Sequence, residues 1–209
     1  MMQTLEFGNP DARIVLIEPI HTEEGMEHEA HFIREMTDVD FSLRAVKVDW
    51  FRDLSPWNAP AVYKNIPFGN GAPETLREVL KLAGDPGKQY FIGGYSMGGL
   101  FALWAALQTD VFAGAAAVSP SVWFPGFTDY AAARQFLTKE IYLSLGEREE
   151  KTRNLVMAAV GDSIRELHSV IRAQGIPCCL EWNEGNHFSD PNRRTEKGFA
   201  WLLKNAAAG

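Results

Sequence analysis

The chain has 209 residues, 46% of them hydrophobic and 22% charged, and a formal net charge of −7. This length suits a single domain over residues 1–209, and no stretch approaches the roughly 18 consecutive apolar residues of a membrane span. The acidic balance, without a clustered basic stripe, argues against nucleic acid as a partner, and the start of the chain lacks the pattern of a secretory signal, which favours a cytoplasmic location.

Short apolar runs alternate with longer amphipathic stretches along the chain, which is typical of an α/β fold. Six strands are predicted, at residues 13–20, 42–49, 89–95, 114–119, 140–145 and 177–183. Helices are predicted between and after them, among them 23–37, 72–83, 152–174 and 195–206. Parallel strands need crossover connections, so we expect a mostly parallel sheet with helices on both faces and with ligands outside the carboxyl ends of its strands.

The third predicted strand leads into Gly94-Tyr95-Ser96-Met97-Gly98, a Gly-x-Ser-x-Gly pattern that an apolar helix follows. This pattern is typical of a nucleophile elbow, a strained turn that lifts the serine Oγ clear of the sheet. A glycine-rich turn that only packs would look the same over five residues, but the strand before it and the helix after it favour the catalytic interpretation. We therefore predict Ser96 as a nucleophile and the Met97 N–H as an oxyanion donor.

A serine hydroxyl is a weak nucleophile, so it needs a base and a group that orients that base. His187 follows the last predicted strand, and it completes the order nucleophile, acid, histidine that α/β-hydrolases show. The acid is expected after the fifth strand, where Glu147, Glu149 and Glu150 stand in a mixed charged run that is also typical of an exposed helix start. Glu149, three residues past Gly146, is the first choice, followed by Glu150 and then Glu147.

A second oxyanion donor is expected from the loop after the first predicted strand. Pro19 has no N–H, so Ile20 is the first choice and His21 the alternative. His28 and His31 lie three apart among glutamates on the first predicted helix, where a metal site is one interpretation and a solvated polar face the favoured one. No metal and no organic cofactor are expected.

Aromatic residues are unusually frequent in the loops that follow the strands. They are Trp50, Phe51, Trp57, Tyr63, Phe68, Trp123, Phe124, Phe127 and Tyr130. Two interpretations stay open: these side chains form the walls of a pocket over Ser96, or they seal the edge of the core beneath long loops. In the first case Trp57 and Trp123, with Tyr95 and His21, would bind a small-molecule ester with an apolar acyl or aryl group.

Two further features are assigned to structure. The adjacent residues Cys178 and Cys179 lie in a predicted strand, where they offer neither a disulfide framework nor a cysteine zinc site. Arg193 and Arg194, followed by Lys197, are the nearest approach to a basic patch and are interpreted as a solvated helix start.

With the elbow, two more motifs carry a family resemblance: Ser119-Pro120-Ser121-Val122-Trp123 and Gly185-Asn186-His187-Phe188. From about residue 91 onward the chain resembles the esterase D-like family of esterases, which includes siderophore esterases, S-formylglutathione hydrolases and mycolyltransferases. The resemblance implies a compact α/β-hydrolase fold without a separate lid. It also carries the roles of nucleophile, acid and base onto Ser96, Glu149 and His187.

The larger members of that family begin with an antiparallel hairpin, for which there is little room before residue 13. We expect a serine esterase that acts on a small-molecule ester through an acyl-enzyme. An acyltransferase on the same fold and a catalytically silent binding protein are the alternatives, because fold does not fix function.

Overall fold

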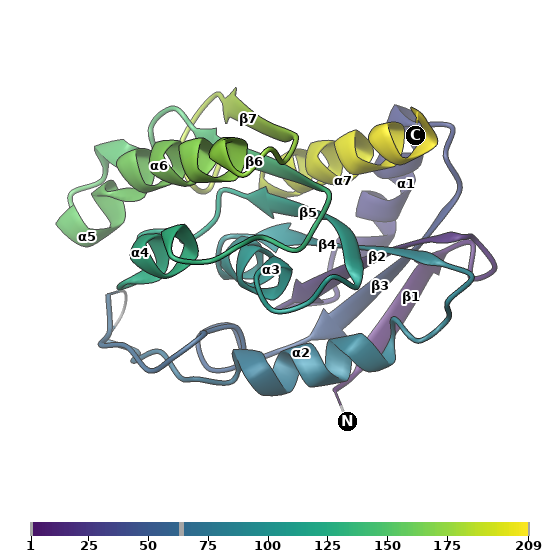
Figure 1. The fold of residues 1–209 in the computed structure, drawn as a ribbon, viewed down its shortest axis with the longest axis horizontal. Coiled ribbons are helices and arrows are strands. Elements are labelled where there is room, and N and C mark those ends of the chain that lie inside the picture. Colours follow the sequence, from purple (N-terminus) through teal and green to yellow (C-terminus); the bar gives the residue numbers. More distant parts are fainter. Residues whose placement is uncertain (1, 63–64, 209) are drawn as a thin grey trace.

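A computed structural model of the protein describes residues 2–62 and 65–208. They form a seven-stranded sheet with helices on both faces (Figure 1). The strands are β1 (Thr4–Gly8), β2 (Ile14–Ile20), β3 (Phe41–Lys47), β4 (Gln89–Tyr95), β5 (Phe112–Val118), β6 (Glu140–Gly146) and β7 (Cys178–Asn183). Their spatial order is β1-β3-β2-β4-β5-β6-β7, in which β1 runs antiparallel to β3 and the other neighbours are parallel.

The helices divide between the two faces of the sheet. They are α1 (Met26–Met36), α2 (Ala72–Lys81), α3 (Met97–Ala106), α4 (Phe127–Ala132), α5 (Leu155–Ala158), α6 (Val160–Ala173) and α7 (Pro191–Ala208), with a 3-10 turn, η1, at Glu149–Lys151. One apolar cluster joins α2, α3, α4 and α6 to the sheet, and a second joins α1 and α7 to its other face. Among the residues described, no helix has the length and hydropathy needed to cross a membrane.

The predicted α/β class and the mostly parallel sheet are confirmed, but the predicted number of six strands is wrong. The additional strand β1 alternates apolar Leu5 and Phe7, which pack toward the core, with polar neighbours. Glu6 bonds both Ser42 and Arg44 of β3. This short, half-exposed edge strand supplies an antiparallel N-terminal partner that the sequence interpretation left no room for.

The predicted helix at 152–174 is two helices that meet at Ala159. Asn154 caps the first, α5, by accepting from the N–H groups of Val156 and Met157. In α6, a Cβ added to Gly161 would collide with the Glu150 carboxylate, so the glycine lets the turn after β6 pack closely against this helix.

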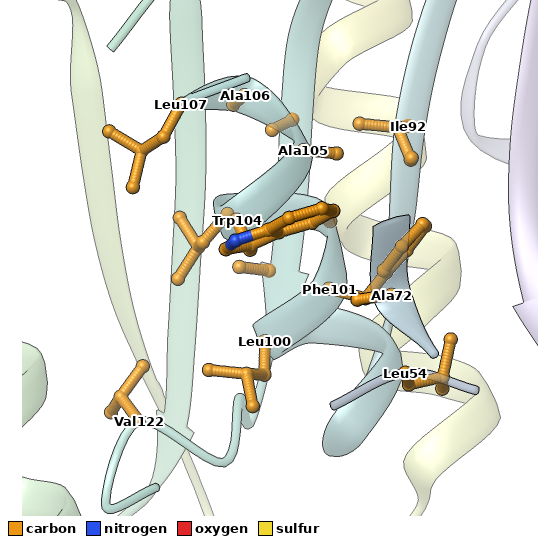
Figure 2. Packing of buried hydrophobic residues seen from close by; sticks show 14 of the residues in the cluster. Leu54, Ala72, Ile92, Leu100, Phe101, Trp104, Ala105, Ala106, Leu107 and Val122 are labelled. Carbon is orange, nitrogen blue, oxygen red and sulfur yellow. The ribbon is translucent and has the colours of Figure 1, made fainter. Parts of the chain in front are cut away.

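Helix α3 is the central support of the elbow. All ten of its residues are buried, and it is apolar around its whole circumference. Figure 2 shows Leu100, Phe101 and Trp104 of α3 packed among Leu54, Ile92 and other buried side chains. Each such side chain contributes about 1.5–3 kcal/mol by burial, so the N-terminus of α3 has a fixed position beneath Ser96.

Candidate active site

Ser96 lies between β4 and α3 with φ 55° and ψ −115°. Few residues other than glycine adopt a positive φ, and strain of this kind lasts only where the surroundings hold it. Here the Ser96 N–H donates to the Val118 carbonyl, and the Ser96 carbonyl accepts from the N–H groups of Leu100 and Ser121. The backbone at Ser96 is therefore fixed in the geometry expected of a nucleophile elbow.

The glycines around Ser96 are required to different degrees. A Cβ on Gly94 would lie 3.0 Å from the Gly98 carbonyl carbon, and one on Gly99 would lie 3.0 Å from the Gly94 oxygen. A Cβ on Gly98 would meet the Pro19 oxygen and Trp50 at 3.5 Å, which is ordinary contact. The close approach of strand and helix thus depends on Gly94 and on Gly99, which lies outside the five-residue pattern.

The structure brings Ser96, His187 and Glu149 together from three separate elements. His187 Nε2 lies 3.1 Å from Ser96 Oγ, and His187 Nδ1 lies 2.7 Å from Glu149 Oε2. A carboxylate only accepts hydrogen bonds, so the proton is assigned to Nδ1, and Nε2 is left free to accept from the serine hydroxyl. This arrangement can remove a proton from Ser96.

Glu149 is buried, with 3% of its side chain exposed. Burial raises the pKa of its carboxyl, but bonds from His187, Ser119 Oγ and the Gly146 N–H, with the positive charge of protonated His187, outweigh burial and lower that pKa. The carboxyl of Glu149 is therefore ionised at neutral pH. It can hold the imidazole tautomer and stabilise an imidazolium.

The other two candidate acids do not contact His187. Glu150 forms an ion pair with Arg165 of α6, 3.0 Å away, and Glu147 is exposed to solvent. Of the three glutamates, only Glu149 points from the turn after β6 toward the histidine.

The structure corrects the sequence interpretation of Arg194, because this residue is buried and not solvated. Its guanidinium lies 2.9 Å from Glu149 Oε1, with 3% of the side chain exposed. Arg193 has 55% of its side chain exposed and pairs with Glu196, as expected for a helix start. Arg194 shares a helix face with Gly198 and Leu202, four and eight residues later, and this spacing is the signal that would have placed it inside.

Two serines after β5 complete the polar site, although only their motif was noted in the sequence. Ser119, at φ 42°, donates to Glu149 Oε1 at 2.7 Å. Ser121 Oγ lies 3.2 Å from Ser96 Oγ. Beyond that motif, no sequence pattern predicts the contacts that these two hydroxyls make.

The predicted oxyanion donors lie at the end of β2 and at the start of α3. Met97 opens α3, so its N–H has no carbonyl one helical turn earlier to bond within the helix. Ile20 is the last residue of β2 and pairs with Lys47, whereas His21 is exposed and follows it. The position of Pro19 beside Gly98 brings the end of β2 next to the start of α3.

An apolar cavity of about 360 Å³ opens at Ser96. Its lining includes the predicted residues Tyr95 and Trp123, together with Trp50, Phe51, Met157 and Phe188. The Tyr95 hydroxyl donates to the His187 carbonyl at 2.6 Å, and burial raises the pKa of Tyr95 to about 12. Tyr95 thus lines the cavity and also braces the histidine.

Trp57 does not line this cavity. Its indole N–H donates to the Pro125 carbonyl, and its ring packs against Phe124 and Tyr130. His21 is also outside the cavity lining, with its ring edge-on to Trp50. The aromatic side chains of these loops therefore have two roles. Trp50, Phe51 and Trp123 form walls of the cavity, whereas Trp57 and its neighbours Phe124 and Tyr130 seal the edge of the core. Tyr63 lies outside the described residues.

The histidines of α1 do not form a metal cluster with their neighbours in the part of the chain that the structure describes. His31 lies 3.4 Å from Glu35 with both side chains more than half exposed, and His28 packs beside Phe32.

No protein-family model matches the sequence, and a search of curated proteins finds no match. Several solved structures share the fold. Siderophore hydrolase EstA from Aspergillus nidulans is 21% identical, with a TM-score of 0.69 over 95% of this chain and 86% of that one. Siderophore hydrolase EstB from the same organism is 17% identical, with a TM-score of 0.70 over 94% of this chain and 84% of that one.

A third structure, the fluorophosphonate-binding serine hydrolase FphF from Staphylococcus aureus, is 12% identical, with a TM-score of 0.61 over 98% of this chain and 97% of that one. The family resemblance is thereby confirmed at the level of the fold. The protein has the α/β-hydrolase fold.

Proposed function

We propose that this protein is a serine hydrolase that cleaves carboxylic esters through an acyl-enzyme on Ser96. The observation that carries the proposal is the chain of contacts from Ser96 Oγ through both nitrogens of His187 to the buried carboxylate of Glu149. A serine on a strained turn, a base within hydrogen-bond reach and an acid that orients the base are the parts that nucleophilic acyl transfer needs.

In the proposed mechanism, His187 Nε2 takes the proton of Ser96 while Oγ attacks the ester carbonyl. The Met97 N–H and a second N–H at the end of β2, from Ile20 or from His21, hold the oxyanion, and each such donor is worth about 10²–10³-fold in rate. His187 then gives its proton to the leaving alcohol, which leaves an acyl group on Ser96. Water activated by the same imidazole releases the acid, and no step needs a metal or an organic cofactor.

The cavity at Ser96 supports a small-molecule ester as the substrate. Its walls are aromatic and thioether side chains, and its polar groups are those of Ser96, Ser121 and His187, with the hydroxyl of Tyr95 bonded elsewhere. Such a pocket favours an apolar acyl group in contact with Trp50 and Trp123. The names of the similar structures, siderophore hydrolases and a fluorophosphonate-binding serine hydrolase, agree with ester cleavage.

The test is covalent labelling with a fluorophosphonate probe, combined with turnover of 4-nitrophenyl esters of increasing acyl length. We expect Ser96→Ala to abolish labelling and to lower kcat by about 10⁵-fold or more. Ser121→Ala is the matched control, because its hydroxyl lies beside Ser96 without contacting His187, and it should still be labelled. Labelling of Ser96→Ala equal to that of the wild type would contradict the proposal.

The two alternatives give different results in the same assays. An acyltransferase would form a new ester or thioester when an alcohol or thiol competes with water, which product analysis detects. A silent binding protein would turn over esters no faster than Ser96→Ala does.

A further inference from the structure

We propose that Arg194 is a positioning residue, whose guanidinium holds the Glu149 carboxylate and the loop that carries His187 in one fixed arrangement. The inference rests on the proposed function, because it concerns how the base is aimed at Ser96. It assigns a role to a cation on α7 that contacts neither Ser96 nor the apolar cavity.

The two terminal nitrogens of the guanidinium, Nη1 and Nη2, connect separate parts of the site. Nη1 donates to Glu149 Oε1 at 2.9 Å and to Ser119 Oγ at 3.1 Å. Nη2 donates to the carbonyls of Glu184 at 2.8 Å and Asn186 at 3.1 Å. Because Asn186 directly precedes the histidine, one rigid planar group joins the acid to the backbone that places the base.

The two oxygens of Glu149 have different partners. Oε1 accepts from Arg194, Ser119 and the Gly146 N–H, whereas Oε2 faces His187 Nδ1. Three donors on one oxygen fix the rotation of the carboxylate. Arg194 therefore keeps the remaining oxygen directed at the imidazole.

The local backbone leaves space for this group. A Cβ on Gly146 would lie 2.9 Å from both Nη1 and Nη2 and 2.8 Å from the Gly185 carbonyl oxygen. Gly185 itself has φ +94°, which turns the chain between Glu184 and Asn186 so that both carbonyls reach the same nitrogen. The guanidinium is as buried as Glu149, so neither group has water as an alternative partner.

The charge of Arg194 has a consequence for the pH dependence. The ionisable groups that face Glu149 are His187 from its loop, Arg194 from α7 and Tyr95 from β4, and the pKa of Tyr95, about 12, keeps it neutral. Without the guanidinium, the negative charge of Glu149 would stabilise the protonated imidazole more strongly. The acid limb of kcat/KM should then move to higher pH.

The experiment compares Arg194→Met, which removes the charge, with Arg194→Lys, which keeps it but loses the planar fork. Turnover of a 4-nitrophenyl ester is followed from pH 5 to 9 and divided by the number of sites that a fluorophosphonate labels, so that unfolded protein is not counted. Arg193→Met, its exposed neighbour, is the control.

We expect Arg194→Met to lower kcat per labelled site by about 10–100-fold with KM within twofold, because a misaimed base slows chemistry without changing the apolar cavity. Its acid limb should move to higher pH. Arg194→Lys should lose about fivefold or more in kcat with the acid limb unchanged, and Arg193→Met should behave as wild type.

The proposal is overturned if kcat per labelled site in Arg194→Lys stays within twofold of wild type, a result that does not require Arg194→Met to fold. It is also overturned if Arg194→Met loses only labelled sites while its pH profile is unchanged, since that is the behaviour of a purely structural residue. Failure of the proposed function would appear differently, as wild-type protein that neither labels nor turns over esters.

Discussion

Buried carboxyls at two places in this molecule, Glu149 after β6 and the pair Glu18 and Glu29, behave in opposite ways. Glu149 accepts from Arg194, Ser119, Gly146 and His187, and its pKa is lowered. Glu18 of β2 and Glu29 of α1 are also buried, but each has an oxygen without a partner among the described residues. Burial is the first cause of their raised pKa values, that of Glu29 being about 7.

The comparison shows that burial does not decide whether a carboxyl carries charge. Donors around Glu149 compensate for the lost water and keep it an anion, whereas Glu18 and Glu29 face each other with the charge of Glu196 nearby. Glu149 therefore keeps its negative charge at neutral pH and can support chemistry there. Glu29 takes up a proton near pH 7, and the pKa of Glu18 is also raised by burial.

The largest effect that sharpens this comparison is expected from Glu149→Gln. An amide presents an N–H to His187 or misorients it, so kcat should fall by about 10³–10⁴-fold. Arg194 would also lose its buried anion, at a cost of about 3 kcal/mol in the free energy of unfolding. Ester kinetics and urea unfolding measure both. Glu150→Gln, which affects only an ion pair with Arg165, should keep near-wild-type kcat.

The second effect concerns Glu29→Gln and the pH dependence of stability. In the folded protein the pKa of Glu29 is raised from 4.5 to about 7. The protonated carboxyl therefore contributes stability that is fully present below pH 4.5 and is lost as pH rises through 7, and the free energy of unfolding falls by about 3 kcal/mol over this range. The variant should lack this loss, so its free energy of unfolding, relative to wild type, should improve between pH 5 and pH 8. The exposed control is Glu27→Gln, which should follow wild type. The prediction is contradicted if the free energy of unfolding has the same slope against pH in wild type, Glu29→Gln and Glu27→Gln.

A smaller effect is expected from Ser119→Ala, which removes one of the donors to Glu149. A bond to a charged group is worth about 1.5–3 kcal/mol, and kcat should fall less than in Glu149→Gln. Since the lowered pKa of Glu149 stabilises the fold above the ordinary carboxyl range, the loss should be full at pH 7 and shrink as acid protonates the group. Ser119→Gly also loses the hydrogen bond but adopts the positive φ without strain. The difference between Ser119→Ala and Ser119→Gly in the same urea titrations therefore measures the backbone strain apart from the lost bond.

The smallest effect is expected at Glu181, a half-exposed carboxylate that Lys197 and Tyr142 contact. Burial raises its pKa, but these contacts outweigh burial and lower it. Lys197→Ala should change the free energy of unfolding by less than about 1 kcal/mol, because solvent screens such pairs. If Lys197→Ala lost as much free energy of unfolding as Glu149→Gln in the same urea experiment, burial would not explain why the contacts of Glu149 contribute more than those of Glu181.

The sequence predicted most of the fold because parallel strands are buried on both faces and leave continuous apolar runs. It missed β1, because a five-residue edge strand that is half exposed carries only a weak alternation. The single-domain organisation and the cytoplasmic location stay predictions.

At the site, the elbow pattern predicted Ser96 and chain order predicted His187, because each follows a strand whose carboxyl end meets the same edge of the sheet. Chain order left three candidate acids after β6, and only the spacing from Gly146 ranked Glu149 first. Arg194 was misassigned since composition treats an arginine as solvated, and only its place on the buried face of α7 distinguishes it from Arg193. Trp57 was misplaced because a loop aromatic can turn to either side of its backbone.

The positive φ of Ser96 implies a trade between stability and activity at one residue. Glycine adopts that backbone conformation without strain, so Ser96→Gly should relieve a local cost of order 1 kcal/mol while removing the only atom of the residue that could attack an ester. A chain selected for stability alone would place glycine there. The serine at this position is thus a small, permanent destabilisation of the native state, tolerated because α3 and its buried surroundings hold the turn in place.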